Sequence, residues 1–250
     1  MRDGNEPLVG TAGEGVTYDV AVRDPATGAT AAYRHAPVPT HPSASVVKVG
    51  ILAALLLRCQ DTGREPSPRE HARAAAMIER SDNDAATELW QVIGGAGGLD
   101  AAHRRLGLRG STAARAWGLS RTTATDQVAL LDAVFGDGPS PLGGRSRAFV
   151  ADLMAHVVAD QAWGVPAAGD APVGRAAVPG SPGRAAAVKN GWMPLSATGL
   201  WVVNSVGRVV AGGRPVLVAV LSGGHTTKEA GVALVEAVAR AALSTGGGVR

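Results

Sequence analysis

The chain has 250 residues, of which 46% are hydrophobic and 18% charged, with a formal net charge of +3 at pH 7. A chain of this length can bury about 70% of its unfolded surface, enough for one large domain or two lobes. Its basic residues are mostly arginines spread along the sequence, so neither a nucleic acid nor a membrane surface is expected as a partner. The single cysteine excludes an intramolecular disulfide, and the longest apolar run is too short to span a bilayer.

Strands are predicted first, and helices follow. Residues 15–23 alternate at close to period two, and residues 29–35 follow a turn as a second strand. A turn-forming segment around Pro42 then leads into an apolar run, which predicts a buried helix from Ser45 to about residue 60. Further helices are predicted at residues 68–80, 84–92, 99–106, 124–135 and 145–158. Residues 164–184, rich in Gly, Pro and Ala, are predicted to be loop.

The pattern returns to strands in the last third of the chain. Strands are predicted at residues 185–191, 199–211 and 215–222, followed by an amphipathic helix over residues 226–243. The two ends of the chain are therefore expected to share one sheet, with helices inserted between them. This predicts a single domain in which residues 1–44 and 185–250 form an α/β lobe and residues 45–184 form a mainly helical lobe.

A serine and a lysine stand at the start of the first predicted helix. Ser45 and Lys48 are three residues apart and so lie on one face of the helix, about one turn apart. A hydroxyl at a helix N-terminus beside an amine can be a nucleophile with its base, and the first N–H groups of the helix can hold an oxyanion. Taken alone, this short motif fits a helix cap and a solvated lysine better.

Two further segments change that interpretation. Ser81, Asp82 and Asn83 form a polar break between helices, which by itself would be a helix N-cap. Lys189 lies on a predicted strand and is followed by an asparagine and Gly191, which by itself would be a protected edge strand. Three such motifs in this order, on these elements, point to one shared site.

Together the motifs resemble those of the penicillin-recognising serine hydrolases, most closely the class A β-lactamase-like group. That family carries S-x-x-K on the first helix of a helical lobe, S-D-N between helices, and K-T/S-G on a sheet strand. Here the first two motifs match fully, and Lys189-Asn190-Gly191 matches at two of three positions. The resemblance implies an α/β (α+β) fold of the β-lactamase/transpeptidase type, with an antiparallel sheet flanked by helices and an inserted helical lobe.

The resemblance also implies roles for individual residues. Ser45 Oγ would attack a carbonyl and become acylated, with Lys48 as proton acceptor or relay. Ser81 would pass a proton to the leaving amine, assisted by Lys189, whose charge would also attract an anionic substrate. The backbone N–H groups of Ser45 and Trp192 would form the oxyanion hole. The expected substrate-binding residues are Asn83, Asn190, Gly191 and Trp192.

The sequence also departs from the family pattern. The β-lactamases of the family deacylate with a Glu on a loop before the helix expected at residues 124–135, but no carboxylate occurs between Arg109 and Ser120. Slow hydrolysis of an acyl-enzyme is therefore expected. Asp126, the nearest acid, lies inside the following helix and is interpreted as a cap or surface residue. No arginine occurs between Gly191 and Gly207 to anchor a substrate carboxylate.

Three functions remain open. The first is a serine hydrolase acting on β-lactams or related amides and esters, with slow deacylation. The second is an acyltransferase, esterase or D,D-peptidase of the same fold, and the third is a non-enzymatic penicillin-binding or sensing module. We expect a monomer that takes a small-molecule or peptide acyl substrate and uses no cofactor. No metal is expected, because the six histidines lack metal-ligand spacing. The chain shows no signal peptide, as in a cytoplasmic protein, although the family is usually exported.

Overall fold

The first and last parts of the chain meet in one antiparallel sheet. A computed structural model describes residues 8–9, 13–35, 38–173 and 185–245. The sheet has the strand order β2-β1-β7-β6-β5, so that the N-terminal hairpin pairs with the C-terminal strands through β1 and β7. The strands are β1 (Thr17–Arg23), β2 (Thr30–His35), β5 (Ala187–Pro194), β6 (Trp201–Ala211) and β7 (Arg214–His225).

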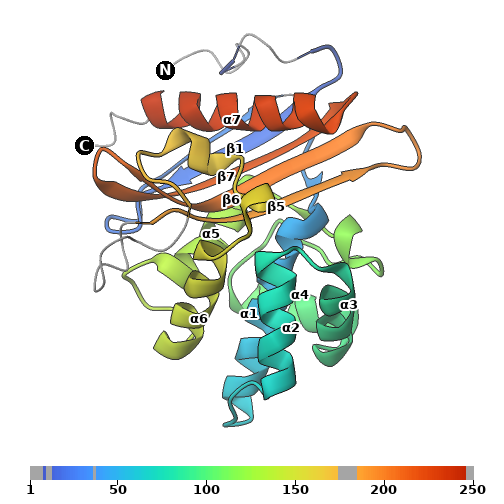
Figure 1. Ribbon diagram of the computed structural model, residues 1–250, viewed down its shortest axis with the longest axis vertical. Helices are drawn as coiled ribbons and strands as arrows, with labels where there is room; N and C mark the ends of the chain where they lie inside the picture. Colours follow the sequence, from blue (N-terminus) through green and yellow to red (C-terminus); the bar gives the residue numbers. More distant parts are fainter. Residues whose placement is uncertain (1–7, 10–12, 36–37, 174–184, 246–250) are drawn as a thin grey trace.

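Helices cover both faces of this sheet. The last helix, α7, lies across one face, and the other helices lie on the opposite side (Figure 1). The helices are α1 (Val47–Asp61), α2 (Pro68–Glu79), α3 (Asn83–Val92), α4 (Gly95–Arg105), α5 (Ala124–Phe135), α6 (Gly144–Ala155) and α7 (Lys228–Thr245). None of the described helices is long and apolar enough to cross a membrane. This is the antiparallel sheet with inserted helices that the sequence predicted.

Each face of the sheet belongs to a different hydrophobic core. The inner core joins α1, which is buried nearly all round, to sheet residues such as Ala187 and Val206. The outer core packs α7 against residues such as Val188 and Val203. Side chains alternate between the two faces of a strand, so Lys189 and Gly191 follow Ala187 onto the inner face. The predicted lysine motif therefore faces the helices.

Several boundaries differ from the predicted ones. The helix predicted at 99–106 begins at Gly95, because glycines are accommodated in α4; at Gly98 a Cβ atom would lie 1.7 Å from the carbonyl oxygen of Ile93. The helix predicted at 145–158 ends at Ala155, and Val158 instead donates to the Glu79 carbonyl. Within the predicted loop 164–184, a short 3₁₀ helix forms at Val165–Ala168, and residues 174–184 lie outside the described part.

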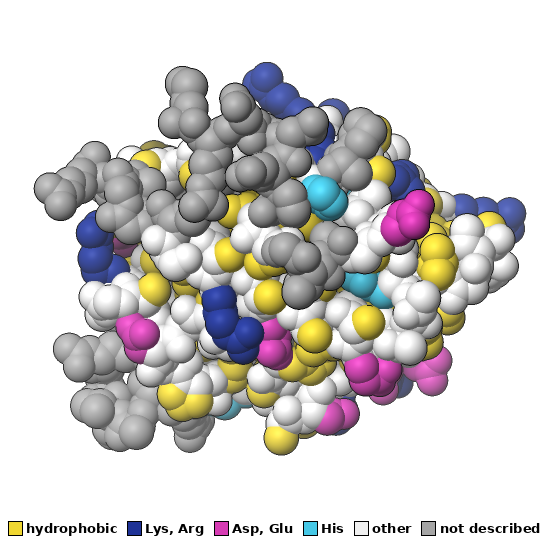
Figure 2. All heavy atoms as spheres, turned by 90° about the horizontal axis from the view of Figure 1, so that it is seen from above, with side chains coloured by type: hydrophobic (Ala, Val, Ile, Leu, Met, Phe, Trp, Pro, Cys, Tyr) yellow, Lys and Arg dark blue, Asp and Glu magenta, His cyan; other side chains and the backbone are white. Residues whose placement is uncertain are grey.

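The surface over α7 carries charges of both signs. Figure 2 views the molecule from that side, and the coloured Lys/Arg and Asp/Glu side chains lie interspersed among hydrophobic ones. On this face the visible Lys and Arg side chains lie apart from one another.

Candidate active site

Ser45 lies in a tight turn at the start of α1. It is the middle residue of a 3₁₀ helix, Ala44–Val46, that leads directly into α1, and its side chain is partly exposed. The preceding Ala44 has φ 46°, in the left-handed region that non-glycine residues rarely adopt. Such strain persists only where the surroundings hold it in place, and it is common at active sites.

The surroundings that hold this turn come from distant parts of the chain. Asn204 on β6 is fully buried, and its Nδ2 donates to the carbonyl oxygens of Pro42 at 2.9 Å and Ser43 at 3.0 Å. The Ser43 N–H donates to the Ser120 carbonyl at 2.7 Å, beside a short pairing of β3 (His41–Pro42) with β4 (Arg121–Thr122). The turn that carries Ser45 is thus hydrogen-bonded to both the sheet and the loop before α5.

Lys48 reaches across to the polar break between α2 and α3. Its Nζ donates to the Ser81 carbonyl at 2.7 Å, to Asn83 Oδ1 at 2.8 Å and to Ser81 Oγ at 3.3 Å. Ser81 has φ 57°, and Asp82, rather than Ser81, caps α3 by accepting from the Ala85 N–H. The left-handed conformation turns the Ser81 hydroxyl away from a capping role and toward the lysine.

Lys189 approaches the same hydroxyl from the sheet. Its Nζ donates to Ser81 Oγ at 3.0 Å and to the Asn190 carbonyl at 2.9 Å. Ser81 Oγ therefore lies between two amines, one from α1 and one from β5. A hydroxyl both donates and accepts hydrogen bonds, so this arrangement can carry a proton between the two lysines.

Both amines lose basicity because they are buried. Burial lowers the pKa of Lys48 to about 8, although the Asp82 carboxylate opposes this shift. Burial also lowers the pKa of Lys189 well below its ordinary value, and the neighbouring Lys48 charge adds to the effect. Two buried ammonium groups bonded to one hydroxyl repel each other. One of the two lysines therefore becomes neutral at a lower pH than an isolated lysine would.

Strand β5 lies directly against the turn that carries Ser45, at Gly191. A Cβ atom on Gly191 would lie 2.5 Å from the Ser45 nitrogen and 2.7 Å from the Val46 nitrogen, closer than real Cβ atoms come. Only glycine permits this approach. The contact brings the backbone of β5 beside the Ser45 and Val46 nitrogens, in the 3₁₀ turn that leads into α1. The Ser45 N–H is one of the two groups predicted to form the oxyanion hole.

The other two predicted substrate-binding residues of β5 point their side chains elsewhere. Asn190 is buried, and its Nδ2 donates to the Gln161 carbonyl at 2.8 Å and the Trp163 carbonyl at 2.9 Å. The Trp192 ring packs against Trp163, with centroids 5.7 Å apart, and Lys228 Nζ lies 4.1 Å from the Trp192 centroid. The Asn190 donors are therefore used within the protein, and the Trp192 side chain belongs to an aromatic cluster with Lys228.

The loop before α5 contributes a residue that the motifs did not indicate. Trp117, in a 3₁₀ helix at Trp117–Leu119, places its ring centroid 4.9 Å from Lys48 Nζ. Its Nε1 donates to Thr87 Oγ1 at 3.3 Å. The available signal was that Trp117 is the only aromatic residue in the carboxylate-free stretch 109–120. An aromatic ring thus lies over the candidate base.

Asp126 is a structural residue in the first turn of α5. It is buried, its N–H donates to the Thr123 cap at 3.0 Å, and its Oδ2 accepts from Ser111 Oγ at 2.7 Å. Thr123 is the cap of α5 and Asp126 is buried, so both predicted roles of Asp126, a cap or a surface residue, are wrong. Its carboxylate is already used in fastening the loop to α5.

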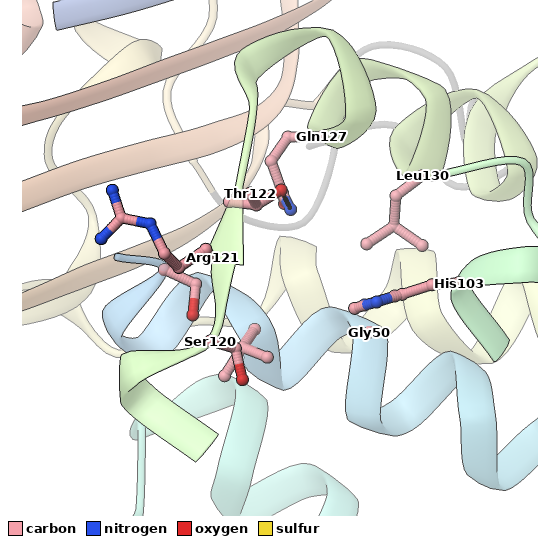
Figure 3. Close-up of a pocket in the computed structure, with 9 residues that line it drawn as sticks. Gly50, His103, Ser120, Arg121, Thr122, Gln127 and Leu130 are labelled. Carbon is pink, nitrogen blue, oxygen red and sulfur yellow. Dashed lines mark hydrogen bonds between the residues drawn. The ribbon is translucent and has the colours of Figure 1, made fainter. Parts of the chain in front are cut away.

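A small cavity lies behind the start of α1. It has a volume of about 10 Å³ and is lined by residues that include Ser43, His103 and Gln127 (Figure 3). This volume suits a single water molecule and is far too small for a substrate. A larger hollow of about 420 Å³ is lined by residues of α4 and the following loop, including Asp100 and Ser111. The residues lining these two spaces do not include either lysine of the site.

Comparison with known proteins assigns the family. Residues 70–245 match the family model described as the "Beta-lactamase enzyme family", which is more than half of the chain. The chain therefore belongs to the β-lactamase enzyme family. The match includes Ser81 and Lys189, whereas Ser45 and Lys48 lie before it and rest on the geometry described above.

Individual relatives agree with this family. The chain is 33% identical over 184 residues to "Putative lipoprotein LppW" of Mycobacterium tuberculosis, a match that covers 72% of this chain and 55% of that protein. The chain thus spans about half the length of the curated relatives it matches.

Solved structures show the same fold. An ancestral class A β-lactamase has a TM-score of 0.69 and 24% identity, covering 91% of this chain and 94% of that one. A β-lactamase from Xanthomonas campestris pv. campestris has a TM-score of 0.71 and 21% identity, covering 91% of both chains. The predicted class A β-lactamase-like fold is confirmed.

Proposed function

We propose that this protein is a serine hydrolase of the β-lactamase type that forms an acyl-enzyme on Ser45 and releases the acyl group slowly. The observation that carries the proposal is the placing of Ser81 Oγ between Lys48 and Lys189, at 3.3 and 3.0 Å. This constellation supplies an amine of lowered pKa, a hydroxyl relay and a second amine at one point. A structural cap or a solvated lysine requires none of these.

The proposed reaction begins with proton removal from Ser45. A neutral Lys48 amine takes the proton as Ser45 Oγ attacks the carbonyl of a β-lactam or a related amide or ester. The backbone N–H groups of Ser45 and Trp192 stabilise the oxyanion, and Gly191 allows the backbone of β5 to approach the Ser45 nitrogen. Collapse of the tetrahedral intermediate breaks the C–N bond of an amide or the C–O bond of an ester. Ser81 passes the proton held by Lys48 to the leaving nitrogen or oxygen, while the acyl group remains on Ser45.

Slow release of the acyl group is supported by the loop before α5. Hydrolysis requires a base that activates water, and residues 109–120 contain no carboxylate. Asp126 accepts a hydrogen bond from Ser111, and Asp82 caps α3. The nearby acidic groups thus have structural partners, and Trp117 covers Lys48.

The same observation supports the second candidate, an acyltransferase, esterase or D,D-peptidase of this fold. In that case another nucleophile, such as an amine or an alcohol, or slow attack by water resolves the acyl-enzyme. The third candidate, a module that only binds penicillin, is less well supported, because binding alone would not need both lysines on Ser81. An exported location is proposed from the relatives named as lipoproteins.

Covalent labelling tests the proposal. A fluorescent penicillin or a fluorophosphonate should label the protein, and Ser45→Ala should abolish labelling without changing the circular dichroism spectrum. Ser43→Ala is the matched control, because this nearby hydroxyl is buried and has no lysine three residues on. Equal labelling of the Ser45→Ala variant would refute the assignment. Turnover of nitrocefin and of p-nitrophenyl esters would then distinguish hydrolase, esterase and binding module.

A further inference from the structure

The Trp117 ring is held firmly in place above the site. Its Nε1 donates to Thr87 Oγ1, and Thr87 Oγ1 in turn donates to the Asn83 carbonyl at 2.9 Å. The indole is therefore connected to α3, the helix that also supplies Asn83 Oδ1 to Lys48. This makes Trp117 part of the same network as the candidate base.

The loop that carries Trp117 is closed by its own hydrogen bonds. Thr112 and Arg121 exchange backbone hydrogen bonds at 2.9 and 2.8 Å, and the Ala114 N–H donates to Ser120 Oγ at 3.1 Å. The Ala113 N–H donates to Asp100 Oδ1 at 2.8 Å, which anchors the loop to α4. Hydrogen bonds at both ends of the loop, together with the bond from Trp117 Nε1 to Thr87, hold the ring near Lys48.

The ring covers the group that would have to activate water. Lys48 is 0% exposed, and the Trp117 centroid lies 4.9 Å from its Nζ. An aromatic face attracts a cation, but it replaces the hydrogen-bonding partners that a water molecule would need there. With no carboxylate in residues 109–120, Lys48 is a group at the site able to act as a base for water, and the Trp117 ring lies over its amine.

We propose that Trp117 is a positioning residue that excludes the hydrolytic water from Lys48 and so determines the lifetime of the acyl group on Ser45. This inference rests on the proposed function. Hydrolysis would form a bond from water oxygen to the acyl carbon, break the bond from that carbon to Ser45 Oγ, and return a proton to Oγ through Lys48. A strong nucleophile such as hydroxylamine attacks the same carbon without needing Lys48 as its base, so the ring does not protect the ester against it.

The experiment measures the lifetime of a benzylpenicillin adduct by intact mass spectrometry. Trp117→Ala should lose the adduct at least about tenfold faster by hydrolysis, a modest part of the 10²- to 10⁴-fold that a general base typically contributes. Its loss to added hydroxylamine should change by less than about twofold, since that attack needs no base. Trp117→Phe keeps a ring over the amine and should restore most of the lifetime. A merely structural role would change both release rates together.

Two further variants keep the test decisive. Trp201→Ala is the matched control, because this tryptophan packs in the outer core on the other side of the sheet, and its adduct should last as long as that of the parent. If Trp117→Ala does not fold, Thr87→Val removes the acceptor of the indole N–H, together with the hydrogen bond from Thr87 Oγ1 to the Asn83 carbonyl, and the adduct should again be lost faster. An adduct lifetime that is the same in the Trp117 or Thr87 variants as in the parent overturns the inference alone. Failure of the parent chain to form any adduct, with penicillins or activated esters, refutes the proposed function and this inference with it.

Discussion

The protonation of Lys48 makes a quantitative prediction for the rate of acylation. Only the neutral amine can take the proton of Ser45, and the pKa of Lys48 is lowered to about 8 by burial. The neutral fraction is then about 1% at pH 6, about 10% at pH 7 and about half at pH 8. The acylation rate should therefore rise about 50-fold from pH 6 to pH 8 and level off above pH 9.

Removing the charge of Asp82 by mutation should shift the pH dependence of acylation in a known direction. Asp82 raises the pKa of Lys48, opposing the effect of burial, and its Oδ1 also caps α3. Asp82→Asn keeps a side chain that caps helices well but removes the charge. The pKa of Lys48 should fall further, so the rise of the acylation rate should move to lower pH.

Stopped-flow acylation with a fluorescent penicillin, at pH 5.5 to 9.5, measures both effects. Lys48→Arg should lose about 10² to 10⁴-fold in acylation rate although it keeps a positive charge, because arginine stays protonated at every pH in this range. Lys228→Arg makes the same change outside the Ser81 network and should acylate normally. A rate that does not change with pH, or a Lys48→Arg variant as fast as the parent, would show that no proton is taken at this position.

Three further outcomes follow from the site. A β-lactam should give a stoichiometric burst followed by slow turnover. Rapid hydrolysis without a burst would show that another group supplies the base, and Asp126 would be the first residue to mutate. Gly191→Ala should abolish acylation, because its Cβ would come within 2.5 Å of the Ser45 nitrogen; normal labelling would contradict this contact. Asn204→Ala should lower the stability by about 1–3 kcal/mol, since it leaves buried carbonyls at Pro42 and Ser43 unpaired. The melting temperature and the acylation rate should both fall. An unchanged melting temperature would contradict the role assigned to the Asn204 amide.

Local patterns were sufficient to predict most of the fold. The helix at residues 124–135 was predicted with its observed bounds, because a threonine cap and an apolar period mark it unambiguously. The short pairing of β3 with β4 was missed, since two-residue strands carry no periodicity. The beginning of α4 was misplaced because glycine was treated as a helix breaker, whereas here it permits close packing.

The site was predictable to the extent that it rests on motifs. The motifs singled out Ser45, Lys48, Ser81 and Lys189. In the structure both lysine amines donate to the Ser81 hydroxyl. The left-handed backbone of Ser81 could not be predicted, because it depends on tertiary contacts rather than on residue type. Neighbouring residues likewise gave no indication of the long-range contacts made by Trp117 and Asn204.

The anchoring by Asn204 of the turn that carries Ser45 has a consequence for how the protein is synthesised and folds. Asn204, whose amide anchors this turn, is synthesised about 160 residues after Ser45. Strand β1 likewise can pair with β7 only after β7 has been synthesised. Contacts between such distant residues form slowly, because a long loop has to close first. A nascent or truncated chain would therefore carry the nucleophile without its support, and acylating ability would appear only after the C-terminal strands have been synthesised and docked.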